Sequence, residues 1–186
     1  MTKNKIYDIL IRYSIATAGL AFVSVGVALS IKSALGTSPI SCPPYVAALI
    51  GGLTVGEWTA AMHGLFILLQ VALLRKQFKL KYLMQIPAAF VFGFLTDAAI
   101  WAFSWIQADS YAAQFALMIL ACIVTAFGIA IEVRSKAWMI AGEQTCVVLS
   151  EVTRKKFSNV KIIFDCSLVV LAAVISYAAF GHWLGD

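Results

Sequence analysis

The feature that most constrains this chain is a series of long apolar runs with very few charges. A bilayer core of about 30 Å needs about 20 residues of helix, and five runs are long enough: residues 13–32, 57–74, 82–105, 112–133 and 160–182. Of the 186 residues, 62% are hydrophobic and only 12% are charged, which is more apolar surface than a soluble domain of this size buries. The sequence therefore predicts an all-α polytopic membrane protein, with residues 1–186 forming a single transmembrane domain.

Two further apolar segments are poor candidates for complete spans. Residues 40–51 are short and contain two prolines, and residues 139–153 carry Glu143 and Glu151. Segments of this length or polarity inside a membrane protein are typical of half-helices, or of re-entrant segments whose backbone is covered by protein. We therefore expect five transmembrane helices plus two short half-helices.

The positions of the basic residues predict the orientation, because cytoplasmic loops carry an excess of Lys and Arg. If neither half-helix crosses the bilayer, the N-terminus is cytoplasmic and the C-terminus is external. Thirteen of the fourteen basic residues then lie on the cytoplasmic side, and only Lys32 is external. The thirteen are Lys3, Lys5, Arg12, Arg75, Lys76, Lys79, Lys81, Arg134, Lys136, Arg154, Lys155, Lys156 and Lys161. Because topology explains the net charge of +5, we expect no nucleic-acid partner.

An internal repeat is indicated by a shift of 102 residues, which superimposes the two halves without a gap. The best-matching stretch pairs identical small residues: Gly26 with Gly128, Ala28 with Ala130, and Ser33 with Ser135. Each of the two units, about 13–75 and 112–182, is predicted to contain a span, a half-helix and a second span. The linking span 82–105 adds one crossing between the units, so the second unit is inverted relative to the first. The alternative is chance similarity between apolar segments. Inverted repeats with broken helices are typical of secondary transporters.

The turn before the first half-helix carries groups that suit an anionic ligand. Its flexible and polar residues are Gly36, Thr37, Ser38 and Ser41. With these hydroxyls as caps, a helix starting at Pro39 would direct free N–H groups and a positive dipole end at an anion. Lys32 precedes this turn and Arg134 takes the matching place in the second unit, so both could guide an anionic substrate. Alternatively, both are snorkelling residues at the membrane interface.

A few polar side chains are placed at or near membrane depth. His63, Asp97 and Asp165 lie within spans, where an aspartate costs about 2.5–3.5 kcal/mol on insertion scales. They are candidates for ion or proton coupling, although Asp165 could be an interfacial cap and His63 could bond a neighbour. Glu143 opens the second half-helix, where a carboxylate suits the helix dipole. Together with Gln144 it could instead belong to a substrate site.

No arrangement typical of an enzyme is present. The sequence contains no P-loop, no HExxH motif and no defensible Ser-His-Asp set, and the four cysteines lack metal-ligand spacing. We therefore expect neither enzymatic activity, nor a metal, nor a cofactor.

Several stretches resemble one family of small bacterial membrane proteins. The stretches LGTSPIS, LTVGEW, LQVALLRKQF and QIPAAFVFGFLTD are similar to the YczE/YyaS/YitT group, and the likeness covers residues 14 to 180. The residues that match its motifs are Leu35, Gly36, Pro39, Gln85, Pro87, Phe92, Gly93 and Asp97. The resemblance implies an integral protein of the bacterial inner membrane. It favours the YczE-like branch, because the soluble C-terminal domain of the YitT branch is absent.

The leading hypothesis is a dimeric secondary transporter that moves a small polar or anionic solute. Its transport could be coupled to protons. Its expected partners are the lipid bilayer, an unknown small solute and a second copy of the chain. One alternative is a substrate-binding membrane subunit of an energised importer, which would need a partner ATPase and has six crossings with both ends cytoplasmic. Another is a non-transporting membrane accessory protein, which would not need acids within its spans.

Overall fold

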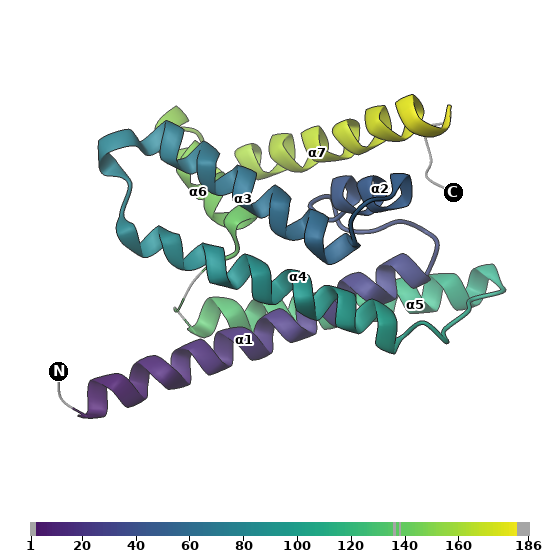
Figure 1. The fold of residues 1–186 in the computed structure, drawn as a ribbon, viewed down its shortest axis with the longest axis horizontal. Helices are drawn as coiled ribbons and strands as arrows, with labels where there is room; N and C mark the ends of the chain where they lie inside the picture. Colours follow the sequence, from purple (N-terminus) through teal and green to yellow (C-terminus); the bar gives the residue numbers. More distant parts are fainter. Residues whose placement is uncertain (1–2, 136, 138, 182–186) are drawn as a thin grey trace. The chain divides into compact units, whose positions relative to one another are not determined.

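The computed structural model describes residues 3–135, 137 and 139–181 (Figure 1). This part of the chain is helical, with turns and short connections between the helices. The seven α-helices are α1 (Lys3–Lys32), α2 (Cys42–Ile50), α3 (Val55–Leu74), α4 (Gln85–Ala102), α5 (Tyr111–Ser135), α6 (Ala141–Thr153) and α7 (Phe157–Phe180). Two 3-10 turns, η1 (Arg75–Gln77) and η2 (Leu80–Met84), connect α3 to α4.

Five of these segments are long and apolar enough to cross a membrane, which confirms the predicted spans. They are Tyr7–Lys32, Val55–Gln77, Tyr82–Ala102, Tyr111–Ser135 and Phe157–Phe180. The other two helices are short, as predicted: α2 has 9 residues and α6 has 13. At 1.5 Å per residue they measure about 14 Å and 20 Å, less than the bilayer core. The protein is therefore a multi-pass membrane protein that also carries two short helices.

The chain forms two compact units, and each unit draws on both halves of the sequence. We call Met1–Gly36 with Phe94–Met139 the helix-pair unit, because it is built on α1 and α5. We call Thr37–Gly93 with Ile140–Asp186 the half-helix unit, because it contains α2 and α6 together with α3 and α7. The boundary within α4 follows Gly93, so each unit includes one part of that helix.

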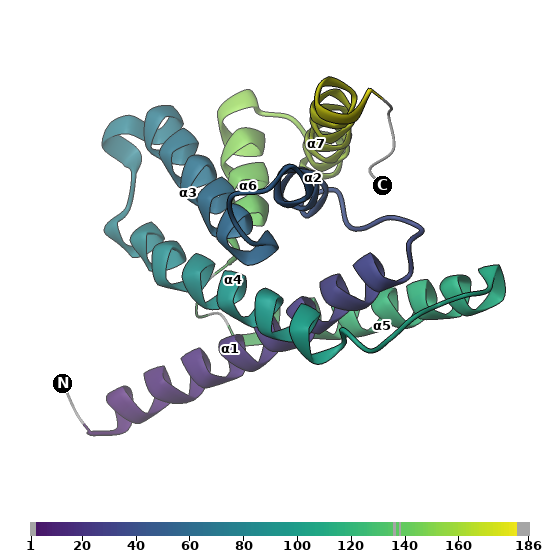
Figure 2. The ribbon, with the colours of Figure 1, turned by 45° about the vertical axis from the view of Figure 1, so that its right-hand side comes forward.

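Within the helix-pair unit, α1 and α5 pack closely and antiparallel through small residues (Figures 1 and 2). A Cβ atom on Gly128 would lie 2.8 Å from the carbonyl oxygen of Gly19. Further along α1, a Cβ on Gly26 would lie 3.0 Å from the carbonyl oxygen of Ala121. Residue numbers rise along one helix as they fall along the other, which gives the antiparallel direction. Only small residues allow backbones to approach this closely.

The contacts of this helix pair recur at positions 102 residues apart. Gly128 faces the backbone of Gly19 and Val23, whereas Gly26 faces the backbone of Ala121 and Thr125. Adding 102 to residues 19, 23 and 26 gives residues 121, 125 and 128. A shift of 102 residues therefore relates the residues of one contact to those of the other. The Gly26 and Gly128 identity in the sequence thus corresponds to two matching close approaches.

The C-terminal ends of α1 and α5 also share one hydrogen-bond pattern. The Ser33 hydroxyl donates to a backbone carbonyl three residues earlier at 2.6 Å, and so does the Ser135 hydroxyl. Each hydroxyl oxygen also accepts a bond from the backbone N–H two residues later, at 3.3 Å and 3.2 Å. The backbone partners are those of Ser30 and Leu35 in the first case, and of Glu132 and Ala137 in the second. Local serine bonds of this kind compete with helix continuation, which explains why both helices end here.

The half-helix unit has a core to which α3, α6 and α7 contribute. In it, α2 packs on α7 and α3, and α6 packs on α3 and α7. The core residues are Phe66, Ile67, Ala141 and Leu168, with Ile40, Met62 and Phe164 packed against them. The Ile40 side chain also covers the backbone of Gly142. Two pairs of residues in this core occupy positions 102 residues apart, 62 with 164 and 66 with 168, and so do the contacting residues 40 and 142.

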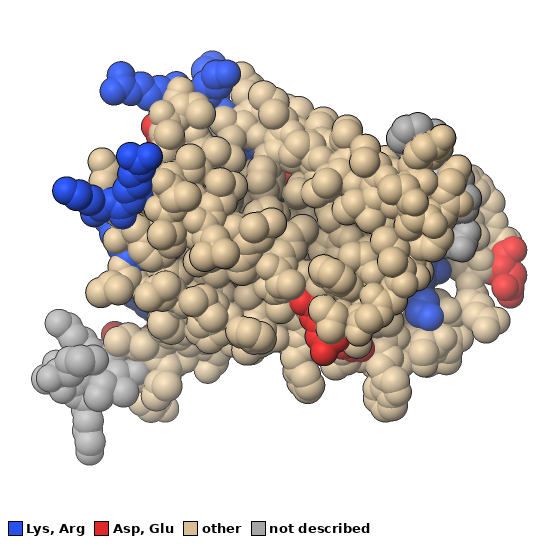
Figure 3. Space-filling model, turned by 45° about the horizontal axis from the view of Figure 1, so that its top comes forward, with Lys and Arg blue, Asp and Glu red and all other residues tan. Residues whose placement is uncertain are grey.

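Exposed basic residues gather at one end of the half-helix unit (Figure 3). They follow the C-terminal end of α3, or join α6 to α7: Arg75, Lys76, Lys79, Arg154, Lys155 and Lys156. All six belong to the set that the sequence predicts to be cytoplasmic. Lys136 and the side chains of Lys3, Lys5 and Lys81 belong to that set too, but lie outside the described residues.

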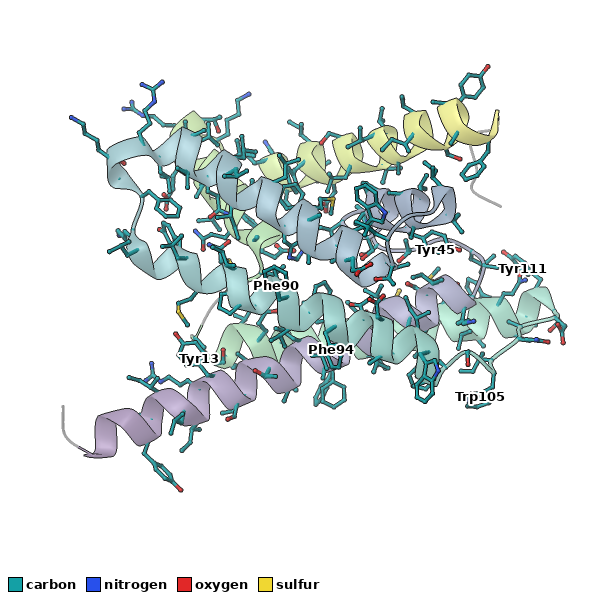
Figure 4. All side chains as sticks on the ribbon, viewed as in Figure 1. Tyr13, Tyr45, Phe90, Phe94, Trp105 and Tyr111 are labelled. Carbon is teal, nitrogen blue, oxygen red and sulfur yellow. The ribbon has the colours of Figure 1, made fainter. Side chains whose placement is uncertain are left out.

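The helix-pair unit exposes aromatic residues around the connection from α4 to α5. Trp101, Trp105 and Tyr111 are 72–80% exposed, and Figure 4 shows Trp105 on this connection and Tyr111 at the start of α5. Amphipathic aromatic rings are enriched where membrane meets water. This loop has no basic residue, which fits its predicted position on the external side.

Candidate functional site

A cluster of oppositely charged side chains in the half-helix unit joins α6 to α7. Lys161 and Asp165 are one turn apart on α7, and Glu143 lies in the first turn of α6. Lys161 Nζ donates a hydrogen bond of 3.0 Å to Glu143 Oε1 and lies 2.9 Å from Asp165 Oδ1. We call these three residues the Lys161 triad. One ammonium thus serves two carboxylates, and the ionised triad carries a net charge of −1.

A second polar cluster is completely buried. Gln70 of α3 and Gln85 of α4 exchange two amide hydrogen bonds, each 3.1 Å long. Gln70 Nε2 also lies within bonding distance of two α6 groups, Thr145 Oγ1 at 3.0 Å and the Ala141 carbonyl at 3.1 Å. We call Gln70, Gln85 and Thr145 the glutamine network. It ties α6 to α3 and α4, while the Lys161 triad ties the same half-helix to α7.

The predicted site residues divide between the two units. Lys32, Gly36, Asp97 and Arg134 belong to the helix-pair unit, and Thr37, Ser38, Ser41, His63, Glu143, Gln144 and Asp165 belong to the half-helix unit. The structure brings Glu143 and Asp165 together, through Lys161. Lys32 and Arg134 end two antiparallel helices, so they lie at opposite ends of that pair. These two cations therefore do not form one site.

The predicted start of the first half-helix was wrong. The helix begins at Cys42 rather than at Pro39, and Ser41 caps no backbone N–H with its side chain, although its oxygen accepts a 2.9 Å bond from the Ser38 hydroxyl. The Cys42 N–H donates to the Ser38 carbonyl, and the Tyr45 N–H donates to the Ser41 carbonyl. The two residues between Cys42 and Tyr45 are prolines, which have no N–H. In this fully described stretch, the first turn therefore has no free N–H for an anion. Consecutive prolines cause this, because their fixed φ favours a helix start while removing its donors.

His63 is the most deeply buried titratable residue among the described candidates. Its side chain is 1% exposed and stacks on Phe92 with ring centres 5.6 Å apart. Within the described part of the chain, His63 Nε2 has no hydrogen-bond partner. Buried polar atoms are nearly always paired, so an unpaired imidazole nitrogen here indicates either a functional role or a tolerated cost of about 1–3 kcal/mol.

Asp97 lies in the part of α4 that belongs to the helix-pair unit. It is partly buried, and the preceding Thr96 donates a 3.3 Å hydrogen bond to the Ser24 hydroxyl of α1. This Thr96–Ser24 bond is buried and joins α4 to α1 one residue before Asp97.

Neither the ion pairs of Lys161 nor the glutamine network was predicted from the sequence. The four-residue spacing of Lys161 and Asp165 was a usable signal, because such pairs face each other on a helix. Gln85 and Thr145 gave no comparable signal, since their partner Gln70 is 15 and 75 residues away. In the described residues, no three His, Cys, Asp or Glu side chains lie together as a metal site would require.

The fold thus defines an all-helical, multi-pass membrane protein with two short helices. The chain belongs to the family described as "Family of unknown function (DUF6198)", whose profile matches residues 10–185. It is similar to "Uncharacterized protein YyaS" of Bacillus subtilis (strain 168), with 23% identity over 171 residues, covering 88% of this chain and 80% of that protein. No solved structure matches the chain. The predicted likeness to YyaS is confirmed, and the assignment to the YczE-like branch stays a prediction.

Proposed function

We propose that this protein is a secondary transporter of a small polar or anionic solute, located in the bacterial inner membrane. The observation that carries the proposal is a recurrence at 102 residues: of backbone contacts in the helix-pair unit, and of core positions and helix packing in the half-helix unit. Such recurrence is what two copies of one structural repeat would produce. Transporters with inverted repeats use the exchange of two repeat conformations to open a central site alternately to each side.

The pairing of the short helices supports the same proposal. A shift of 102 residues relates α2 to α6 and α3 to α7. The packing of α2 on α7 therefore corresponds to the packing of α6 on α3, and both are observed. The N-caps of α3 and α7, Thr54 and Lys156, are also 102 residues apart. The contact of Ile40 with Gly142 brings the starts of both half-helices together. We expect the solute to pass near this point, beside Glu143 and Gln144.

The orientation in this proposal has a cytoplasmic N-terminus and an external C-terminus. The exposed basic residues at the end of α3 and the start of α7 support it, because they would lie on the cytoplasmic side. Lys32 and Arg134, at opposite ends of the α1–α5 pair, would then each attract anions on one face of the membrane. No covalent chemistry is needed, so the proposal is non-enzymatic.

A first experiment tests the orientation on which the inversion depends. The C-terminus is fused separately to a fluorescent protein that folds only in the cytoplasm and to a phosphatase active only in the periplasm. Phosphatase activity without fluorescence supports five crossings and an inverted second repeat. Fluorescence without phosphatase activity would mean that one short helix crosses, and would favour the importer-subunit alternative.

A second experiment tests transport itself. Purified protein in proteoliposomes on a solid-supported membrane is exposed to phosphate, sulfate, short mono- and dicarboxylates, and neutral amino acids. Solute-dependent currents or internal pH changes, absent from empty liposomes, would support the proposal. If no compound in the panel elicits a current or a pH change, and the C-terminus is cytoplasmic, the proposal is rejected.

A further inference from the structure

We propose that the basic end of the half-helix unit binds the phosphate groups of anionic phospholipids in the adjacent membrane leaflet, with Arg75 and Arg154 as its main contacts. The basic end consists of six exposed residues: Arg75, Lys76, Lys79, Arg154, Lys155 and Lys156. Lipid binding here needs neither a transported solute nor a particular orientation of the chain.

The parallel packing of α3 on α6 brings these six residues together (Figures 1 and 2). The Phe66 ring lies 3.8 Å from the position of a Cβ atom on Gly142. One turn further along both helices, Gln70 bonds Thr145 at 3.0 Å. Residue numbers thus rise together along the two helices, so both helices end on the same side of the unit. Each is followed directly by an arginine there.

The charge of the basic end is largely uncompensated. Among residues 71–84 and 147–164, only Glu151 is acidic. In the described part of the chain none of the six basic residues forms an ion pair, whereas Lys161 of α7 has two. Clusters of Lys and Arg beside spans are attracted to the negatively charged surface of a membrane. The charge therefore favours an anionic partner outside the protein.

Two arginines of the basic end occupy backbone positions that favour glycine. Arg75 has a φ of 46° and Arg154 a φ of 55°, and each is the C-cap residue of its helix. In the described chain three non-glycine residues have positive φ, and these arginines are two of them. Glycine adopts such a conformation without steric strain. The presence of arginine at both helix ends therefore indicates a use for the guanidinium group, which can bind a phosphate through two parallel hydrogen bonds.

Exposed apolar side chains place the basic end at the depth of the lipid head groups. Leu80, which follows Lys79, is 81% exposed. Phe157, which follows Lys156, is 44% exposed. Three candidate spans begin or end here: Val55–Gln77, Tyr82–Ala102 and Phe157–Phe180. Apolar and basic side chains in alternation are typical of interfacial surfaces. A phospholipid supplies both an anionic phosphate and acyl chains, whereas a soluble anion supplies only the charge.

Lipid bound at the basic end would act on two helices that also meet inside the unit. Gln70 of α3 and Thr145 of α6 share a buried hydrogen bond. The same helices continue to Arg75 and Arg154, so phosphates held by both arginines would fix the ends of helices that are already joined. A ligand that binds only the folded state stabilises it by mass action. We therefore expect anionic lipid to stabilise the half-helix unit.

The test measures lipid binding to the full-length protein in a neutral detergent. Phosphatidylglycerol is added in one series, and phosphatidylcholine with the same acyl chains, which has no net charge, in another. Native mass spectrometry counts the lipids bound at each concentration. A third series uses glycerol phosphate, a phosphate ester without acyl chains, to distinguish a lipid from a soluble anion. We expect phosphatidylglycerol to bind more tightly than either compound and to raise the midpoint of thermal unfolding.

The decisive variant is Arg75→Gly/Arg154→Gly. It removes both guanidinium groups but supplies the residue that the backbone favours, so the protein should fold. Each basic residue near an anionic surface strengthens binding about fivefold, so phosphatidylglycerol should bind this variant about 25-fold more weakly. Arg154→Gly alone should weaken binding about fivefold. Its matched control is Arg12→Gln, which removes one exposed arginine from the helix-pair unit and should leave the affinity unchanged.

A folded double glycine variant that keeps the wild-type affinity for phosphatidylglycerol would overturn the inference. An equal loss of affinity in Arg12→Gln would overturn it too, because it would show a general attraction between charges. Equally tight binding of glycerol phosphate would instead show a site for soluble anions. If the glycine variant does not fold, Arg75→Gln/Arg154→Gln replaces it with the same criteria. Solute currents play no part in these measurements, so lipid binding and transport stand or fall separately.

Discussion

The backbone of Gly19 in α1 lies directly against the backbone of Gly128 in α5. A Cβ atom on Gly19 would approach the Gly128 carbonyl oxygen to 2.9 Å, and one on Gly128 would approach the Gly19 carbonyl oxygen to 2.8 Å. The obstructing atoms are backbone atoms of a helix, which cannot rotate away as a flexible side chain does. Any larger residue at either position must therefore separate the two helices.

Gly128→Leu should destabilise the helix pair for this reason. Overpacking a close contact costs about 1–3 kcal/mol, so we expect a lower midpoint in thermal unfolding of the detergent-solubilised protein. Gly64→Ala is the matched control, because nothing lies within 4 Å of a Cβ atom there. Alanine is also the better helix former, so the control should be neutral or slightly stabilising. Equal stability of Gly128→Leu and the wild type would contradict the close contact.

The spans were predictable because membrane insertion depends on length and apolar composition, which are local properties of the sequence. The packing of those spans was only partly predictable. The sequence shows that Gly26 and Gly128 are identical at the repeat spacing. The reason is a close antiparallel crossing of α1 and α5, which only the spatial positions of Ala121 and Gly19 reveal.

The candidate site was harder to predict than the spans, for physical reasons that differ between residues. The first half-helix has prolines both at Pro39 and directly after Cys42, so two helix starts fitted the same composition. Lys161 near the start of α7 counted as one more cytoplasmic charge, and its spacing from Asp165 was overlooked. Gln85 gave no local signal, because its bonding potential is satisfied by a residue on another helix.

Gln70→Leu should be more damaging than an ordinary substitution of glutamine. It leaves the buried Gln85 amide without its partner, and such a loss costs about 1–3 kcal/mol. The double variant Gln70→Leu/Gln85→Leu removes both amides, so its cost should be smaller than the sum of the two single costs. Unfolding in a denaturing detergent series measures all three variants. Gln77→Leu, on the exposed η1 turn, is the control and should change little, and simple additivity would contradict the buried pair.

Asp97→Asn should abolish solute uptake while leaving expression and folding intact. Asparagine keeps the size of the side chain but removes its charge, and ionisable groups within spans usually serve a function. The measurement is the current elicited by whichever solute of the panel is active, with Asp109→Asn in the exposed loop as the control. Full uptake by Asp97→Asn would remove Asp97 from the mechanism.

His63→Phe should retain or raise the unfolding midpoint, although it replaces a polar residue in a buried position. His63 Nε2 has no hydrogen-bond partner in the described chain, so its removal leaves no other group unsatisfied and relieves a desolvation cost. A phenyl ring can also keep the stacking on Phe92. His63→Ala is the contrasting variant: it opens a cavity and should cost about 2 kcal/mol or more. A transport role for His63 predicts that His63→Phe gains stability but loses uptake, as substitutions of strained functional residues often do. A strongly destabilised His63→Phe would instead show that the imidazole has a polar partner and that its role is structural.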